Sequence, residues 1–270
     1  MGKEIQSLIE AKSPLLMGIL NTTPDSFSDG GEFFNPKKAI SHAIQMQSEG
    51  ADIIDIGGES TGPGSQEVKE KEELERVIPV VSQLSKQLAI PISVDTYKSA
   101  IAERALGEGA TFINDVTALR QDPDLAKLIA AKKCPVVMMY SKDNSPRTTV
   151  EPKEYEDVIK TIINFFDERI DYAKKQGISM EQIIIDPGMG QFISSIPKYS
   201  YEILARLSEL KTFGLSILVG TSRKSFLGGK MESREEKGLT ADAIAIMNGA
   251  SILRVHEVGR SREFINSLNK

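Results

Sequence analysis

Polar side chains end most of the short apolar runs in this chain, and their types suit binding of a flat, nitrogen-rich ring. Aspartate accepts hydrogen bonds from ring N–H and amino groups, and asparagine can donate and accept at once. A buried aspartate needs such partners to remain charged. The residues at the ends of these runs are Asn21, Asp55, Asp95, Asn114 with Asp115, Tyr140 and Asp186.

Cationic side chains follow the last two apolar runs. Arg223 and Lys224 lie within the segment Ser222–Ser225, and Arg254 lies two residues before His256, a spacing that points both to the same face of a strand. The guanidinium fork of arginine and the compact charge of lysine both suit phosphate oxygens. The segment Ser222–Ser225 could also open a helix whose N-terminal amides favour an anion. Together these patterns predict a site for a polar heterocycle that carries phosphate.

A simpler explanation is that any strand ends in polar residues because a loop begins there. That explanation accounts for one or two aspartates. It accounts poorly for the division of the chain, in which the first six runs end mainly in acids and amides while the last two bring cations. Barrel enzymes often hold phosphate in the loops after the seventh and eighth strands.

The first apolar run is followed by an unusually long polar loop. Residues 15–21 are apolar up to Asn21, and residues 22–31 are dense in Thr, Ser, Asp, Gly and Pro. A simple connector needs only a few such residues, so we expect this loop to bind a ligand. We interpret it as a lid that closes over the site and excludes water. The residues assigned to this lid are Thr22, Asp25, Phe27 and Ser28.

The order of apolar and amphipathic segments predicts one (β/α)8 barrel over residues 1–270, with residues 1–13 as an N-terminal extension. Eight short apolar runs, each followed by a helical segment, are typical of a parallel sheet covered by helices. The expected strands are residues 15–21, 52–57, 91–95, 111–116, 135–140, 182–186, 215–220 and 251–256. The expected helices are residues 36–50, 68–88, 98–108, 123–132, 154–176, 199–211, 240–248 and 262–268, with Asn35 as N-cap of the first.

Composition excludes several classes of protein. The net charge of -5 argues against a nucleic-acid binder, and no segment has the roughly 18 apolar residues of a membrane span. Residues 1–13 lack the apolar core of a signal peptide, so we expect a cytoplasmic protein. The chain has no phosphate-binding P-loop, no nucleophile elbow and no dinucleotide fingerprint, which disfavours covalent hydrolase and nicotinamide chemistry.

Seven segments in sequence order resemble the motifs of dihydropteroate synthase. Each is weak alone, but together they span residues 15–256. The resemblance implies a (β/α)8 barrel that condenses 6-hydroxymethyl-7,8-dihydropterin pyrophosphate with p-aminobenzoate, giving 7,8-dihydropteroate and pyrophosphate. The segments are Asn21–Gly31 (NTTPDSFSDGG), Asp55–Thr61 (DIGGEST), Asp95-Thr96, Asn114–Val116 (NDV), Asp186–Gly190 (DPGMG), Ser222–Phe226 (SRKSF) and Arg254–His256 (RVH).

The resemblance also implies a role for each matching residue. Asn21 would help to hold Mg2+ on the pyrophosphate, and a homodimer through the last helices is expected. The reaction in the family passes through departure of pyrophosphate, so no covalent intermediate on the protein is needed. The implied pterin-binding residues are Asp95, Asn114, Met138, Asp186 and Lys224; the pyrophosphate residues are Asn21, Asp55, Arg254 and His256; the p-aminobenzoate residues are Thr61, Pro63, Phe192, Arg223 and Ser225. The implied catalytic residues are Asp95, Asp186, Lys224, Arg254 and His256.

Two departures from the family pattern fall on the p-aminobenzoate side. Gly62 stands where the family has arginine in Ser-Thr-Arg-Pro-Gly, and Gln191-Phe192 has a displaced aromatic residue with no lysine after it. The first reading is an unchanged reaction with Phe192 as the aromatic residue. The second is a synthase that excludes sulfonamides, because Met189-Gly190 resembles the sulfonamide-insensitive branch. The third is a paralogue that binds pterin without using p-aminobenzoate.

Two functions of other classes remain as alternatives. A pterin-dependent methyltransferase would share the aspartates and the asparagine, but it would not need Arg223, Lys224, Arg254 and His256 for a pyrophosphate. Methyl transfer from methyltetrahydrofolate would identify it. A non-catalytic pterin-binding protein would bind the ligand without releasing pyrophosphate.

Overall fold

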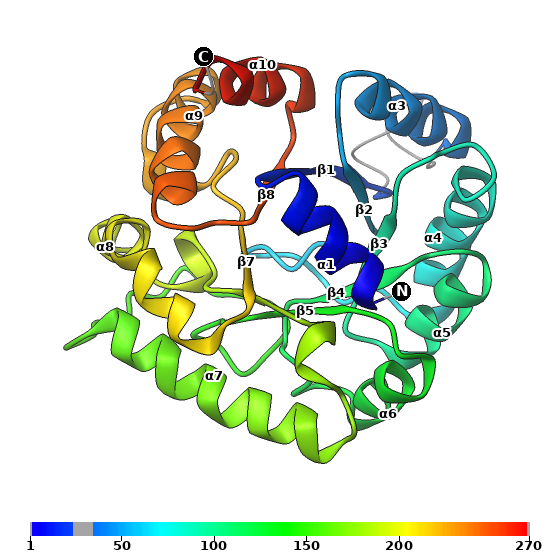
Figure 1. The fold of residues 1–270 in the computed structure, drawn as a ribbon, viewed down its shortest axis with the longest axis horizontal. Coiled ribbons are helices and arrows are strands. Elements are labelled where there is room, and N and C mark those ends of the chain that lie inside the picture. The colour runs from blue at the N-terminus through cyan, green and yellow to red at the C-terminus, as the bar shows by residue number, and fades with distance from the viewer. Residues whose placement is uncertain (1, 24–34, 269–270) are drawn as a thin grey trace.

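The computed structural model describes residues 2–23 and 35–268, and it forms a closed barrel of eight parallel strands (Figure 1). Each strand pairs with its neighbours in sequence, and β8 pairs with β1 to close the barrel. This confirms the predicted (β/α)8 fold. The strands are β1 (Leu15–Asn21), β2 (Ile53–Gly57), β3 (Ile92–Asp95), β4 (Phe112–Asp115), β5 (Val136–Met139), β6 (Ile183–Asp186), β7 (Ser216–Val219) and β8 (Ile252–Val255).

A ring of helices surrounds the barrel, as Figure 1 shows. Short 3-10 helices, labelled η, occur in the connections; those near the site are η2 (Gly190–Phe192) and η4 (Ser225–Leu227). The α-helices are α1 (Gly2–Ala11), α3 (Pro36–Ser48), α4 (Glu70–Leu84), α5 (Ser99–Gly107), α6 (Pro123–Lys132), α7 (Val158–Lys175), α8 (Lys198–Arg206), α9 (Met231–Met247) and α10 (Val258–Leu268).

Side chains alternate between two apolar layers along each strand. In β2, Ile54 and Ile56 pack against the helices, whereas Ile53 belongs to the cluster that fills the barrel. Because successive side chains of a strand point to opposite faces, Asp55 also points into the barrel, one layer above Ile53. The same alternation carries Asp95 inward from β3. The strands therefore deliver polar side chains to the carboxyl end of an otherwise apolar interior.

Helix α1 closes the opposite end of the barrel. Ile5 and Ile9 are buried in the same cluster as Leu15 and Met17 of β1, and Figure 1 shows α1 lying across the barrel opening. The sequence predicts residues 1–13 as an N-terminal extension. Of these, Ile5 and Ile9 fill the amino-terminal end of the barrel and belong to its core.

Several helix boundaries are as predicted, and others differ. Asn35 caps α3 by accepting hydrogen bonds from the backbone N–H groups of the second and third residues that follow it, and α6 spans the predicted residues 123–132. Helix α9 begins at Met231, not at residue 240, and α7 begins at Val158 because Asp157 caps it. The predicted helix 199–211 is an α-helix that ends at Arg206 and continues as a 3-10 helix to Phe213.

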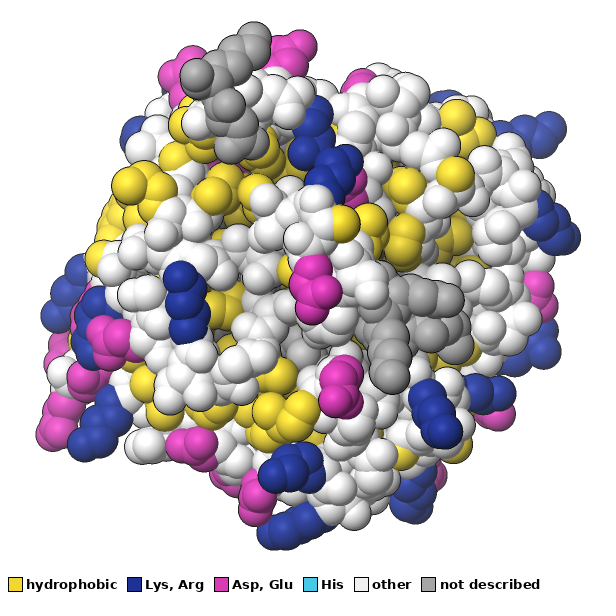
Figure 2. All heavy atoms as spheres, in the orientation of Figure 1, with side chains coloured by type: hydrophobic (Ala, Val, Ile, Leu, Met, Phe, Trp, Pro, Cys, Tyr) yellow, Lys and Arg dark blue, Asp and Glu magenta, His cyan; other side chains and the backbone are white. Residues whose placement is uncertain are grey.

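The outer surface is mixed in charge. Figure 2 shows the end of the barrel covered by α1, where basic and acidic side chains are interspersed around the rim. Over the described part of the chain, no helix has the length and apolar character required to cross a bilayer. The single cysteine, Cys134, is buried, and burial raises the pKa of its thiol to about 11.

Candidate active site

A cavity of about 440 Å3 opens at the carboxyl end of the barrel. This size is typical of small-molecule sites. The cavity gathers side chains from the carboxyl ends of all eight strands and from the loops that follow them, and most of the residues predicted from strand ends are among them. Its lining is Ile19, Asn21, Thr23, Glu59, Ser60, Thr61, Gly62, Asp95, Asn114, Val116, Met139, Asp186, Met189, Phe192, Gly220, Ser222, Arg223, Lys224, Arg254 and His256.

Arg254 forms hydrogen bonds with carboxylates on two neighbouring strands at the base of the cavity. Its Nε donates to Oδ2 of Asp55 at 2.7 Å, and its Nη2 donates to Oδ2 of Asp95 at 2.8 Å. The side-chain amide of Asn114 also donates to Oδ2 of Asp55, at 3.0 Å. Asp55 is fully buried and does not itself line the cavity, so it acts from below by orienting Arg254 and Asn114. Four predicted site residues are thus held in one network.

Two of the carboxyl groups that line the cavity, those of Asp95 and Asp186, are hard to ionise in the absence of a ligand. Burial raises the pKa of Asp186 to about 6, although the N–H of Gly188 at 2.8 Å and the nearby Lys224 favour its charged form. Burial also raises the pKa of Asp95 to about 7, with Arg254 opposing and Asp55 reinforcing the rise. Such groups favour a ligand that brings hydrogen-bond donors to them.

Lys224 lies opposite these acids. Burial and the charge of Arg254 lower the pKa of its ammonium group to about 8, while Asp186 and Asp95 oppose the fall. Its Nζ lies 4.7 Å from the centre of the Phe192 ring, a cation–π distance. Lys224 therefore stands between the acids and the aromatic wall and can contact a ligand that spans both.

His256 is neutral in this site, although we expected it to add to the cations. Burial and the charges of Arg223, Arg254 and Lys224 lower the pKa of its ring to about 3. Its Nδ1 lies 3.0 Å from the hydroxyl oxygen of Ser222. The neutral ring can still donate one hydrogen bond, and an anion placed between it and Arg254 would favour its protonation.

Arg223 is oriented by two glutamates. Its φ of 61° places the backbone in the left-handed region, and its guanidinium forms ion pairs with Glu235 of α9 and with Glu257. The expectation that Ser222–Ser225 opens a helix with free amides is wrong, because only the three-residue helix η4 follows and α9 begins at Met231. Anion binding on this side therefore depends on side chains.

Comparison with known proteins identifies the family. The sequence profile of the family described as pterin binding enzyme matches residues 17–256. A dihydropteroate synthase from Synechocystis sp. is 43% identical over 252 residues, which cover 92% of this chain and 86% of the relative. The chain belongs to the dihydropteroate synthase family.

Solved structures of the family agree. Dihydropteroate synthase of Xanthomonas albilineans with 4-aminobenzoic acid superposes with a TM-score of 0.88 at 39% identity, covering 96% of this chain and 93% of that chain. The same enzyme in complex with 7,8-dihydropteroate gives a TM-score of 0.84 at 38% identity, with the same two coverages. The resemblance seen in the seven motifs is thereby confirmed.

Three residues do not lie where the sequence placed them in this dihydropteroate synthase fold. Met138 faces the helices, and its neighbour Met139 lines the cavity instead, because side chains alternate along β5. Asp115 likewise points away from the cavity and accepts hydrogen bonds from the backbone of Thr117 and Leu119. Tyr140 lies outside the cavity lining, with its hydroxyl 3.2 Å from that of Tyr155.

Some of the loop residues predicted at the site line the cavity, and others do not. Thr61, Phe192 and Arg223 line the cavity as expected, whereas Pro63 and Ser225 are exposed outside its lining. Thr22 is not part of a lid body, because it is fully buried and its N–H and hydroxyl both donate to the carbonyl of Gly57. The other lid residues, Asp25, Phe27 and Ser28, lie outside the described residues.

Glu59 is a lining residue to which sequence reasoning gave no role. Its carboxylate accepts a hydrogen bond from Nζ of Lys98 at 2.6 Å and another from the hydroxyl of Tyr97. Lys98 also donates to Glu73 of α4 at 2.6 Å. This network fixes the loop after β2 beside the cavity. The partners are 38 and 39 residues from Glu59 in sequence, so no local pattern connects them.

Proposed function

We propose that this cavity condenses 6-hydroxymethyl-7,8-dihydropterin pyrophosphate with p-aminobenzoate to give 7,8-dihydropteroate and pyrophosphate. The observation that carries the proposal is the placement of Asp95, Asn114 and Asp186 next to Lys224 and Arg254 in one cavity. Acids and an amide meet a nitrogen-rich ring, and the adjacent cations meet its pyrophosphate. A solved relative with 7,8-dihydropteroate supports the same conclusion.

The pterin ring would bind against the buried acids. Asp186 would accept hydrogen bonds from the ring N–H and amino groups, and Asn114 would donate and accept beside it. Lys224 would donate to an acceptor on the ring. Burial raises the pKa of Asp186 to about 6 because its charged form has lost water. Hydrogen bonds from the ring donors would replace that water and stabilise the charge.

The chemical step would break the bond between the pterin methylene carbon and the pyrophosphate oxygen. The electron pair leaves with pyrophosphate, the electron-poor methylene is attacked by the amine nitrogen of p-aminobenzoate, and the nitrogen then loses a proton. Arg254, through its charge, and His256, through one ring N–H, would stabilise the charge on the leaving group. Asp95 would stabilise the positive charge that develops on the ring.

The described residues fit a Mg2+ ion that arrives with the substrate. Asn21 offers a carboxamide oxygen at the cavity, while the described residues hold no cluster of three His, Cys, Asp or Glu side chains suited to a metal. Such a sparse donor set suits Mg2+, which commonly keeps waters and binds substrate phosphates. When bound, the ion neutralises part of the pyrophosphate charge. Asn21→Ala should weaken the Mg2+-dependent part of pyrophosphate binding measured by calorimetry.

p-Aminobenzoate would bind between the loops after β2, β6 and β7. Thr61, Phe192 and Arg223 line this side, and Phe192 supplies an aromatic wall. That position supports the reading in which Phe192 replaces the usual aromatic residue. The second reading, exclusion of sulfonamides, would show as inhibition constants far above the KM for p-aminobenzoate. A KM in the usual range with strong inhibition would support the first.

We also propose a homodimer through the last helices, in a cytoplasmic protein. Large apolar side chains are exposed there: Met247 of α9 is 83% exposed, and Ile244, three residues before it on the same helix, is 36% exposed. Neighbouring exposed apolar side chains commonly mark interfaces. Met247→Glu should convert a dimer to a monomer in sedimentation velocity, whereas Val150→Glu in the loop before α7 should not. A monomeric unsubstituted protein would contradict the proposal.

Omission of one component at a time tests the function. The chain, incubated with the pterin pyrophosphate, p-aminobenzoate and Mg2+, should release pyrophosphate and form dihydropteroate. Each product should disappear when either substrate is left out. Pterin binding without pyrophosphate release would indicate the non-catalytic alternative, and methyl transfer from methyltetrahydrofolate would indicate the methyltransferase.

A further inference from the structure

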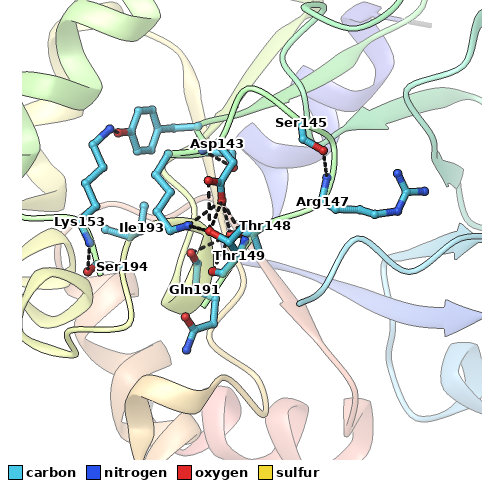
Figure 3. A network of polar contacts seen from close by, with 12 residues as sticks. Asp143, Ser145, Arg147, Thr148, Thr149, Lys153, Gln191, Ile193 and Ser194 are labelled. Atoms are coloured by element: carbon cyan, nitrogen blue, oxygen red, sulfur yellow. Dashed lines mark hydrogen bonds and ion pairs between the residues drawn. The ribbon is translucent and has the colours of Figure 1, made fainter. Parts of the chain in front are cut away.

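The loop between β5 and α7 contacts both loops in which the sequence departs from the family. Thr148 is 2% exposed, and its backbone N–H donates to the carbonyl of Thr61 at 3.1 Å. Its hydroxyl lies 2.8 Å from the carbonyl of Gln191. One buried residue therefore bridges the segment that contains Gly62 and the segment that contains Phe192. Figure 3 shows Thr148 beside Gln191.

Other groups on the same loop orient this bridge. The hydroxyl of Thr148 also lies 2.9 Å from a carboxylate oxygen of Asp143. A hydroxyl has one hydrogen, so the Gln191 carbonyl and Asp143 share it. Asp143 is itself fixed by the backbone N–H of Thr149 at 3.0 Å and by Nζ of Lys142 at 2.6 Å. Asp143 therefore holds the Thr148 side chain in place beside Gln191 while it shares that hydrogen, and Figure 3 shows Asp143, Thr148, Thr149 and Gln191 together.

Arg147 provides a second attachment to the loop after β2. Figure 3 shows its side chain pointing away from the cluster around Asp143. Its guanidinium forms an ion pair with Glu59, which Lys98 also holds. Arg147 and Thr148 thus bind the loop after β2 at Glu59 and Thr61. Of the two residues, Thr148 also forms a hydrogen bond with Gln191.

The backbone freedom of Gly62 explains why the loop after β2 needs the contacts from Arg147 and Thr148. A glycine has more backbone freedom than any other residue, so the loop loses more entropy when it is fixed. A Cβ at Gly62 would meet only Ser60 Oγ, at 3.6 Å, so no packing holds this position. The bonds from Arg147 and Thr148 replace the restraint that a side chain at position 62 would provide.

We propose that Thr148 is a positioning residue for p-aminobenzoate. Together with the backbone N–H of Lys142, which donates to the carbonyl of Phe192 at 2.8 Å, it fixes the distance between Thr61 and Phe192, two of the residues that line that side of the cavity, without touching the substrate. The inference rests on the proposed function. It also separates the two substrates, because the pterin residues Asp95, Asn114 and Asp186 belong to strands that the bridge does not contact.

The test compares Thr148→Val with two matched variants. Valine keeps the shape and the N–H bond to Thr61 but removes the hydroxyl. Loss of one hydrogen bond corresponds to about a three- to tenfold effect, so KM for p-aminobenzoate should rise by about that factor. KM for the pterin pyrophosphate and kcat should stay within about twofold. Thr148→Ser, which keeps the hydroxyl, and Thr240→Val, at an exposed position of α9, should both resemble the unsubstituted enzyme.

A second variant keeps the test decisive if Thr148→Val lowers Tm. Gly62→Ala reduces the freedom of the loop, so it should lower KM for p-aminobenzoate more in the Thr148→Val background than in the unsubstituted chain. Equal rises in both KM values, equal effects of Thr148→Ser and Thr148→Val, or additive effects of the Gly62 and Thr148 changes would each overturn the inference. Failure of the unsubstituted enzyme to form dihydropteroate would instead overturn the proposed function.

Discussion

The cavity concentrates ionisable side chains whose proton affinities are set by burial. Asp95 and Asp186 have raised pKa values, and Lys224 has a lowered one, because all three are withdrawn from water. Groups of opposite charge that are both shifted toward neutrality are suited to a ligand that supplies donors on one side and acceptors on the other.

Removal of Asp186 should strongly weaken pterin binding without loss of the fold. Asp186→Ala deletes the acceptor for the ring donors, and hydrogen bonds to charged groups are worth enough that kcat/KM for the pterin pyrophosphate should fall by about 100-fold. Steady-state kinetics measures this. Affinity for pyrophosphate alone, which depends on Arg254, should be retained within a few-fold in calorimetry. Normal turnover by Asp186→Ala would contradict the assignment.

Activity should depend on pH with a maximum between about 7 and 8. Asp95 gains a proton below pH 7 and Asp186 gains one below pH 6, and above pH 8 Lys224 loses the proton that it donates. The profile of kcat/KM for the pterin pyrophosphate should be bell-shaped, since it reports the free enzyme. Lys224→Arg should extend the alkaline limb because arginine stays charged. A flat profile from pH 5 to 9 would argue against these roles.

Sequence reasoning identified the residue types at the site but not every side chain that enters it. Asp95, Asn114, Asp186, Lys224 and Arg254 are brought together as predicted. Their order along apolar strands was sufficient for this, because strand ends converge in a barrel. Whether Met138 or Met139 lines the cavity depends on which side chains of β5 point into the barrel. A single apolar run cannot show that direction, because both of its faces are buried.

At the scale of elements, helix α9 carries a buried acid behind the active-site loop. Asp242 is 4% exposed and accepts a hydrogen bond from the hydroxyl of Thr221, just after β7, at 2.6 Å. Burial raises its pKa from 3.8 to about 7, although that hydrogen bond favours the charged form. This acid therefore links the protonation state of α9 to the loop that contains Arg223 and Lys224.

Asp242→Asn should stabilise the protein at alkaline pH. The folded state keeps a proton on Asp242 that the unfolded chain releases between pH 4 and 7, so this contribution to stability is present below pH 4 and is lost as pH rises through 7. At pH 8 the variant should gain about 2 kcal/mol in free energy of unfolding, with little gain at pH 4. Asp171→Asn, on the exposed face of α7, should show no such pH dependence in denaturant unfolding. Equal effects at both pH values would refute the prediction.

Element boundaries show where sequence patterns are sufficient. Asn35-Pro36 and Asp122-Pro123 predict helix starts because an N-cap followed by proline has a definite geometry. The start of α9 was missed because residues 231–237 are mostly polar and lack an apolar period, and Lys230 makes no side-chain cap bond. Tertiary contacts, not local pattern, extend that helix.

For the whole molecule, the cavity and helix α1 lie at opposite ends of the barrel. The cavity lies at the carboxyl ends of the strands, while α1 closes the amino ends with Ile5 and Ile9. The spacing of Ile5, Leu8 and Ile9 is helical and was visible in the sequence. That this apolar face packs into the barrel interior depends on the closed fold, so the local sequence pattern could not predict it.

Truncation of an α1 side chain should therefore lower stability without changing kinetics. Ile5→Ala removes apolar surface from a site that is 4% exposed, and it should lower the free energy of unfolding by about 2 kcal/mol. Thermal or denaturant unfolding measures this, while kcat and both KM values should remain unchanged. Ile44→Ala, at the 38% exposed position on α3, should have a far smaller effect on unfolding. A kinetic defect in Ile5→Ala would contradict the separation of the two ends.

The most direct test is a crystal structure of the enzyme with 6-hydroxymethyl-7,8-dihydropterin pyrophosphate and Mg2+ bound. The pterin ring should lie against Asp95, Asn114, Asp186 and Lys224, with the pyrophosphate against Arg254 and His256. The space between Thr61 and Phe192 should remain open for p-aminobenzoate. A pterin ring in that space, or outside the cavity, would contradict the proposed arrangement.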